Sequence, residues 1–172
     1  MKAARLVGYR QDFEIGDVPE PEITAPTDVI VRVAAAGFCR TDIHIWDGQF
    51  AAAWQGAGVG LPFVPGHETA GWVHEVGSAV THISVGDAVL LHPLMTCGYC
   101  HFCRAGDDMH CTASVFPGIF APGGFAELIK TNARAIVRVV LRRRNSPHVD
   151  LERARVSSAT IRVRSRYTSC LV

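Results

Sequence analysis

The sequence predicts a mainly β fold, a small barrel or sandwich, and three observations support this prediction. Short apolar runs recur along the first 139 residues, and glycine-containing turns separate them. Few stretches show the 3.6-residue period of an amphipathic helix. Of the 172 residues, 48% are hydrophobic, which is enough for one buried core with a small appendage. We therefore expect one β domain with short helices.

Six strands are expected in chain order, each bounded by turn residues. Gly37 and Gly77 close two of them, and the Gly123-Gly124 pair precedes another. The prolines within residues 18–23 indicate an extended connection between the first two strands. One short helix is expected to begin at residue 40 or 41 and to end near residue 46. The expected strands cover residues 1–6, 28–36, 70–76, 88–91, 125–129 and 135–139.

Four of the six cysteines lie close together, at Cys97, Cys100, Cys103 and Cys111. Thiolates two or three residues apart on a tight loop can converge on one ion at about 2.3 Å, as in a structural zinc site. A pair of disulfides or unrelated buried thiols is the alternative. The absence of a secretory signal at the N-terminus favours the metal. We expect residues 95–112 to form a loop that zinc holds, a zinc knuckle.

The net charge of +1 conceals two regions of opposite charge. Residues 1–137 carry eight Lys and Arg against fourteen Asp and Glu, whereas residues 138–172 carry nine Arg, no Lys and two acidic residues. All sixteen glycines lie at or before Gly124. This break predicts a basic tail, residues 140–172, that packs poorly against the barrel, and a disordered, solvated tail is the default interpretation.

The composition of the tail, rich in Arg and Ser, is typical of an out-of-frame reading of a GC-rich gene. The alternative is a functional basic arm. Ile161, Val163 and Tyr167 alternate with arginines, as in an amphipathic strand, and such a charge can neutralise phosphates.

A second group of possible ligands is Cys39 together with His67 and Glu68. A thiolate, an imidazole and a carboxylate are each credible zinc ligands, and catalytic zinc uses mixed sets with an open position. The spacing alone is weak evidence, since an isolated Cys or His is usually just packed in the fold.

Several motifs, in order along residues 1–139, resemble the zinc-dependent medium-chain alcohol dehydrogenases. They are Cys-Arg-Thr-Asp-x-His at 39–44, Gly-His-Glu at 66–68 with Ala-Gly-Trp at 70–72, Val-Gly-Asp-Ala-Val at 85–89, and the four-cysteine knuckle. The resemblance implies that residues 1–139 are the GroES-like catalytic β-barrel of that family. In the family a Rossmann domain that binds the nucleotide follows this barrel.

The resemblance also implies roles for individual residues. Cys39 and His67 resemble ligands of the catalytic zinc, and Glu68 resembles the carboxylate that can enter its coordination during ligand exchange. Asp42 resembles the acid that fixes the His67 tautomer by accepting its other ring N–H. A charge on the helix surface is the alternative for Asp42.

Three further residues of the same motif match family positions. Thr41 and His44 resemble the relay that carries the alcohol proton to solvent; a packed or exposed histidine is the alternative for His44. Arg40 resembles the contact to the cofactor pyrophosphate, or is a solvated arginine. Trp46 and Trp54 either line a substrate pocket or have a packing role in the core or at the surface.

The activity implied by the resemblance is oxidation of an alcohol to an aldehyde or ketone, with zinc and NAD(P) as cofactors. The sequence departs from the family beyond residue 139. It has no Gly-x-Gly-x-x-Gly turn, and no residue after 140 matches the third ligand of the catalytic zinc. We therefore expect a truncated or frameshifted copy without a Rossmann domain, inactive as an isolated chain.

A second function remains open, a zinc-stabilised binding module whose Arg-rich tail contacts nucleic acid or an acidic partner. Nucleic acid is the less favoured partner. No uncharged run is long enough to span a membrane, so we expect a cytoplasmic protein without membrane contact. Oligomers occur in full-length relatives and remain open for this chain.

Overall fold

The computed structural model describes residues 1–139, and the expectations for the tail, residues 140–172, lie outside this part of the chain. Within the described residues the fold is mainly β, as predicted. Its strands are β1 (Lys2–Arg5), β2 (Glu14–Asp17), β3 (Asp28–Gly37), β4 (Glu68–Val76), β5 (Ala88–Leu91), β6 (Leu128–Asn132) and β7 (Ile136–Arg138).

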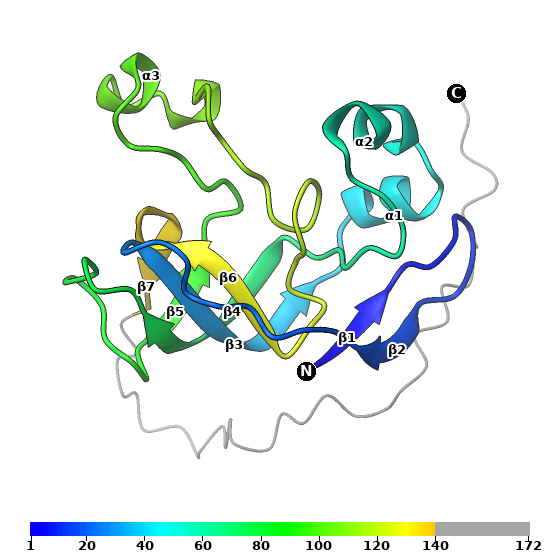
Figure 1. Ribbon diagram of the computed structural model, residues 1–172, viewed down its shortest axis with the longest axis horizontal. Helices are drawn as coiled ribbons and strands as arrows, with labels where there is room; N and C mark the ends of the chain where they lie inside the picture. Colours follow the sequence, from blue (N-terminus) through cyan, green and yellow to red (C-terminus); the bar gives the residue numbers. More distant parts are fainter. Residues whose placement is uncertain (140–172) are drawn as a thin grey trace.

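Two sheets carry these strands, and every pairing within them is antiparallel (Figure 1). The larger sheet has the order β6-β3-β4-β5-β7, and β1 pairs with β2 separately. The helical segments are α1 (Arg40–Trp46), α2 (Ala51–Ala57), α3 (His101–Arg104) and the 3-10 turns η1 (Asp108–His110) and η2 (Ala133–Ala135). In Figure 1, α1 and α2 lie together at one end of the barrel, and α3 lies on an arm that projects from it.

The strand expected over 125–129 forms three residues later, at 128–132, because the preceding residues pair elsewhere. The amide of Phe125 donates to the carbonyl of Pro65, and the carbonyl of Phe125 accepts from Ala4. These bonds tie residues 123–126 to the chain before β4 and to β1. The carbonyl of Glu127 accepts from Val33 of β3, and the paired register with β3 begins at Leu128. Strand β2 and helix α2 were not expected. The sequence of β2, Glu-Ile-Gly-Asp, has no strong strand pattern, and the alanine-rich sequence of α2 has no side-chain cap to mark the start of a helix.

The larger sheet buries a cluster of branched side chains on one face. Val29 and Val31 alternate along β3, as the two-residue period of a strand requires, and they pack with Val73 of β4 and Val89 of β5. All four are at most 2% exposed. This cluster fixes the register between β3 and β4, because a slip by one residue would turn these side chains to the opposite face of the sheet.

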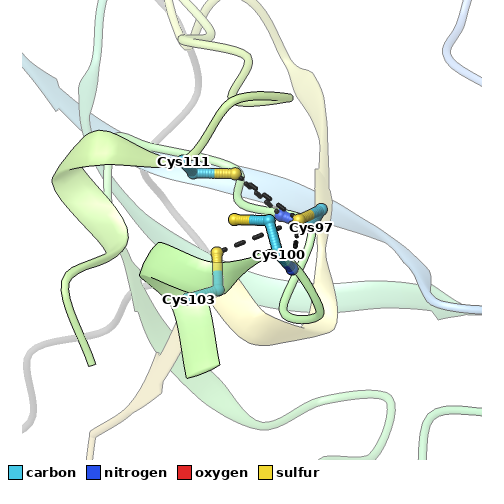
Figure 2. A group of neighbouring side chains, drawn as sticks. All are labelled: Cys97, Cys100, Cys103 and Cys111. Atoms are coloured by element: carbon cyan, nitrogen blue, oxygen red, sulfur yellow. Dashed lines mark hydrogen bonds between the residues drawn. The ribbon is translucent and has the colours of Figure 1, made fainter. Parts of the chain in front are cut away.

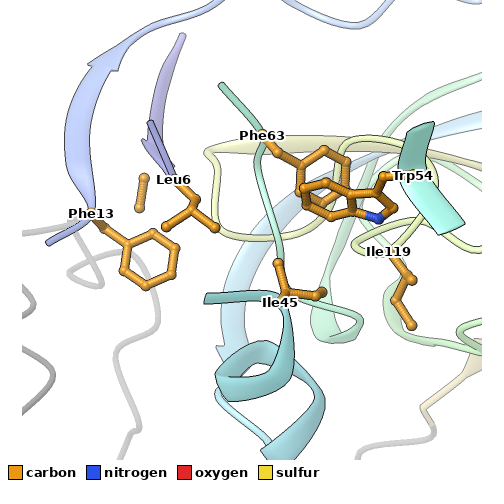
Figure 3. Close-up of a cluster of buried hydrophobic side chains, with 7 residues drawn as sticks. Leu6, Phe13, Ile45, Trp54, Phe63 and Ile119 are labelled. Carbon is orange, nitrogen blue, oxygen red and sulfur yellow. The ribbon is translucent and has the colours of Figure 1, made fainter. Parts of the chain in front are cut away.

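A second cluster lies between the β1–β2 sheet and the two longer helices (Figure 3). Leu6, Ile45, Phe63 and Trp54 are at its centre, and the indole ring of Trp54 lies 4.4 Å from the ring of Phe63. Trp54 is 1% exposed, so it has the core role that was one of its two interpretations. Trp46 is half-buried, and its Nε1 donates to the carbonyl of Gln11 at 2.7 Å.

A buried carboxylate fixes the start of β3. Asp28 accepts hydrogen bonds from the amides of Thr24 and Ala25, at 2.9 and 2.8 Å, and from the Thr24 hydroxyl at 3.0 Å. Burial alone would raise the pKa of Asp28, but these hydrogen bonds outweigh it and hold the pKa below its ordinary value. Across residues 1–139, every helix is too short or too polar to cross a membrane.

Candidate metal centres

The four clustered cysteines bring their sulfur atoms together at one point of the projecting arm (Figure 2). Cys97 Sγ lies 3.6 Å from Cys111 Sγ and 3.9 Å from Cys103 Sγ. A disulfide would need about 2.05 Å, so these thiols are free. Two zinc–sulfur bonds of about 2.3 Å at a tetrahedral angle place their sulfurs about 3.8 Å apart. The knuckle therefore fits zinc.

Backbone amides point at the sulfur atoms of the knuckle. The amide of Cys100 donates to Cys97 Sγ, and the amide of Cys97 donates to Cys111 Sγ, both at 3.4 Å. Gly98 makes the turn between the first two thiols with a φ of 79°, a region that side chains with a Cβ rarely adopt. The turn thus directs the Cys100 amide at Cys97 Sγ and brings the Cys100 thiol close to the Cys97 thiol.

Thiols within the knuckle differ in pKa because their surroundings differ. A hydrogen bond from the Cys103 amide lowers the pKa of Cys100 to about 6, and one from the Cys97 amide lowers the pKa of Cys111. Burial raises the pKa of Cys103 to about 12. Binding of a metal there must therefore displace a proton from Cys103.

One arginine connects the knuckle to the sheet. Arg134 Nη2 donates to both carboxylate oxygens of Asp108, at 2.8 and 2.9 Å, and its Nε donates to Thr96 Oγ1 at 3.0 Å. These hydrogen bonds lower the pKa of Asp108. Sequence reasoning missed Arg134, and no local signal was available, because its partner lies 26 residues away in the chain.

The second site joins helix α1 to the turn before β4. Cys39 Sγ lies 3.3 Å from His67 Nε2. Zinc bonds to a thiolate and an imidazole at a tetrahedral angle place the two ligand atoms about 3.5 Å apart. Cys39, His67 and Asp42 each have a ligand atom within 4.8 Å of the others. The pair therefore fits a zinc ion, and we call these three residues the split site.

Asp42 is fully buried, at 0% exposed, and holds the two halves of the split site by their backbones. One of its oxygens accepts from the amide of Cys39 at 2.9 Å and the other from the amide of Gly66 at 3.2 Å. Asp42 lies beside His67 as expected, but the ring N–H of His67 does not donate to it. His67 Nδ1 is buried and has no hydrogen-bond partner within residues 1–139.

The structure places the remaining predicted residues around this group. Glu68 is exposed, and its carboxylate packs against Gly37, outside the set of close ligand atoms. Thr41 and His44 are half-buried on α1, and Arg40 is exposed at its first residue. His44 Nδ1 is a buried nitrogen with no partner among the described residues.

Sequence reasoning also missed the side chain that packs on the His67 ring. The ring of Phe116 lies 5.4 Å from that of His67 in an edge-to-face arrangement. A periodic pattern could not have found Phe116, because it belongs to no regular element.

Comparison with known proteins identifies the family. The model of the alcohol dehydrogenase GroES-like domain matches residues 25–140. An alcohol dehydrogenase of Geobacillus stearothermophilus is 34% identical over 140 residues, which are 81% of this chain and 40% of the relative. An L-threonine 3-dehydrogenase of Chelativorans sp. (strain BNC1) is 40% identical over 139 residues, 81% of this chain and 39% of the relative.

Solved structures agree with this match. The alcohol dehydrogenase of the hyperthermophilic archaeon Aeropyrum pernix superimposes with a TM-score of 0.76 and 43% identity, over 81% of this chain and 40% of that one. The chain thus spans about two fifths of the length of these relatives. It belongs to the zinc-dependent medium-chain alcohol dehydrogenase family and matches the GroES-like domain of that family.

Proposed function

We propose that residues 1–139 are the zinc-binding catalytic domain of an NAD(P)-linked alcohol dehydrogenase that converts an alcohol to an aldehyde or ketone. The observation that carries the proposal is the 3.3 Å separation of Cys39 Sγ and His67 Nε2, which residues 28 positions apart reach only through the fold. A thiolate and an imidazole are donors of catalytic zinc sites, and the Asp42 carboxylate beside them accepts from the backbone amides of Cys39 and Gly66. The names of the relatives, alcohol and threonine dehydrogenases, support the same reaction type.

When bound, zinc would supply a Lewis acid for the alcohol oxygen, and NAD(P) would supply the hydride acceptor. Cys39 and His67 would hold the metal from two segments, and the Asp42 carboxylate keeps those segments together. Glu68 follows His67 directly, and its side chain must rotate away from Gly37 before its carboxylate can join them. Support for this exchange role comes from the family motif.

Thr41 and His44 are the proposed path for the proton. They are three residues apart on α1, so their side chains are neighbours on one face of the helix. The buried Nδ1 of His44 has no partner among residues 1–139 and is free to accept or donate a hydrogen bond. Arg40, exposed at the first residue of the same helix, is the proposed contact for a cofactor phosphate. The knuckle, with four thiols and no open position, has a structural role.

Counting zinc per chain by native mass spectrometry tests the proposal. We expect two zinc ions in the wild-type protein and one in His67→Ala. The matched control is His74→Ala, because His74 is an exposed histidine on β4. If His67→Ala retains two zinc ions, the split site is not a metal site and the proposal fails.

A further inference from the structure

We propose that a two-sided clamp on Gly66, the residue before His67, sets the distance between the zinc ligands Cys39 and His67. One side is Asp42, and the other is the Gly123-Gly124 turn, more than fifty residues further along the chain. The inference rests on the proposed function, since it concerns the same metal site. It assigns positioning roles to residues that contact neither the metal nor the substrate.

The first side acts on amide groups. The Asp42 carboxylate accepts from Gly66 N–H and from Cys39 N–H, so a single buried group sets the separation of the two backbones that bear the ligands. A buried carboxylate with two amide donors is costly to displace, because moving it leaves both donors unpaired.

The second side acts on carbonyl groups. Gly124 N–H donates to the carbonyl of Gly66 at 2.7 Å, and Gly123 N–H donates to the carbonyl of Val64 at 2.8 Å. Phe125 N–H donates to the carbonyl of Pro65 at 3.0 Å. Three consecutive amides thus fasten the segment that leads into His67. Gly66 is thus held on both sides of its Cα: its N–H donates to the Asp42 carboxylate, and its carbonyl accepts from the Gly124 amide.

The close approach of the two backbones explains the glycines. A Cβ on Gly123 would lie 2.5 Å from the Pro65 carbonyl oxygen and closer still to that of Gly66. A Cβ on Gly118 would lie 2.5 Å from the same Gly66 oxygen. Gly118 has a φ of 82°, which itself favours glycine, whereas the φ of Gly123 is not positive. Glycine is therefore required at position 123 only because a Cβ has no room there.

Metal coordination makes this spacing critical. Ordinary contacts of a Cβ begin at 3.4 Å, and a Cβ at position 123 would lie 2.4 Å from the Gly66 carbonyl oxygen, so the two must separate by about 1.0 Å. Ligand distances in metal sites are held to within about 0.2 Å. The Gly66–His67 peptide would move relative to Asp42 and Cys39, and the two ligand atoms would no longer converge.

Gly123→Ala in the full 172-residue chain tests the clamp, with Co²⁺ as the probe. Absorbance from the Cys39 thiolate–cobalt bond reports on the split site, and retained knuckle zinc reports on folding. We expect Gly123→Ala to weaken Co²⁺ binding at the split site by about 10–100-fold, as the loss of residues that orient metal ligands does. The matched control is Gly56→Ala, where no atom lies within 4 Å of the new Cβ. It should bind Co²⁺ like the wild type.

A second variant decides the matter if Gly123→Ala fails to fold. Asp42→Asn keeps one acceptor oxygen but places an amide donor against one of the two backbone N–H groups, so we expect the same weakening with knuckle zinc intact. If Gly123→Ala folds and binds Co²⁺ within twofold of the wild type, the clamp is wrong. If only Asp42→Asn folds, Co²⁺ binding within twofold of the wild type in that variant refutes the clamp. If the wild type itself gives no Co²⁺ signal that depends on Cys39, the proposed function fails instead.

Discussion

The two metal centres reach similar ligand spacings by opposite means. The knuckle takes its four thiols from one stretch, Cys97 to Cys111, and the turn at Gly98 and short helix α3 already aim them at one point. The split site takes Cys39 from the N-cap of α1 and His67 from a turn 28 residues away. Its geometry comes from the packing of β3, β4 and the 123–125 segment around Gly66.

This difference predicts how strongly the order of each centre depends on its bound metal. Local turns aim the thiols of the knuckle, but the loop needs its metal to stay ordered, because it has few buried side chains of its own: Tyr99 and Met109 are 74% and 72% exposed. In the split site the chain organises the metal, because the barrel is held by two apolar clusters. Loss of zinc should therefore unfold the loop and leave the barrel.

The largest effect is expected from Cys100→Ser. Structural zinc binds with about 10–16 kcal/mol in small zinc-dependent folds, and part of this free energy is folding free energy. We expect the variant to lose one zinc ion and the order of loop 95–112, while Co²⁺ binding at the split site persists. Native mass spectrometry and hydrogen exchange measure both effects, and Ser114→Ala, an exposed loop residue, is the control. An unchanged metal count would rule out the knuckle as a zinc site.

Chelation should distinguish the centres in the wild-type protein. Four thiolates hold zinc more tightly than a thiolate, an imidazole and an adjustable carboxylate, so a mild chelator should remove one zinc ion and leave the other. In His67→Ala only the tightly held ion should be present from the start. Two ions that resist chelation equally would contradict the comparison.

Acid should weaken the barrel through Asp28. Its folded pKa lies below the ordinary value of about 3.9, so its stabilisation is complete above that pH and is lost as the pH falls through the folded pKa. Asp28→Asn should lower the free energy of unfolding by about 1–3 kcal/mol at pH 7, because amide donors lose an acceptor. The difference from the wild type should shrink below about pH 4.

Urea unfolding of metal-free protein at pH 7 and pH 3 measures this, with the exposed Asp12→Asn as the control. A difference that stays constant between the two pH values would show that the Asp28 carboxylate is not the titrating group.

The smallest effect is expected at the attachment of the knuckle to the sheet. Arg134 and Asp108 are 43% and 36% exposed, so solvent and salt weaken their interaction. Arg134→Ala should speed chymotrypsin cleavage near Tyr99 without changing the number of zinc ions. The control is Arg104→Ala, which removes an exposed arginine from α3. Added salt should have less effect on the variant than on the wild type, and equal effects would exclude the ion pair as the attachment.

The same difference between local and long-range contacts decides which features could be predicted from the sequence. The β class, the strand at 88–91, helix 40–46 and the four knuckle cysteines were predictable, because each depends on residues near one another in the chain. The match of residues 25–140 to a family model confirms the GroES-like fold. The residue roles at the split site stay predictions.

The shift of β6 to residue 128 and the two-sided hold on Gly66 were not predictable. They depend on contacts across more than fifty residues, such as that from Gly124 to Gly66, which no local period encodes.

The position of Cys111 in the chain has a consequence for the order of events during synthesis. Cys111 is translated twelve residues before Gly123, so all four knuckle ligands leave the ribosome before the turn that holds His67 exists. Short loops close within about 10–100 ns, far faster than the addition of an amino acid. The nascent chain should thus capture its first metal ion cotranslationally at the knuckle, and acquire the ion of the split site only after β6 has joined β3.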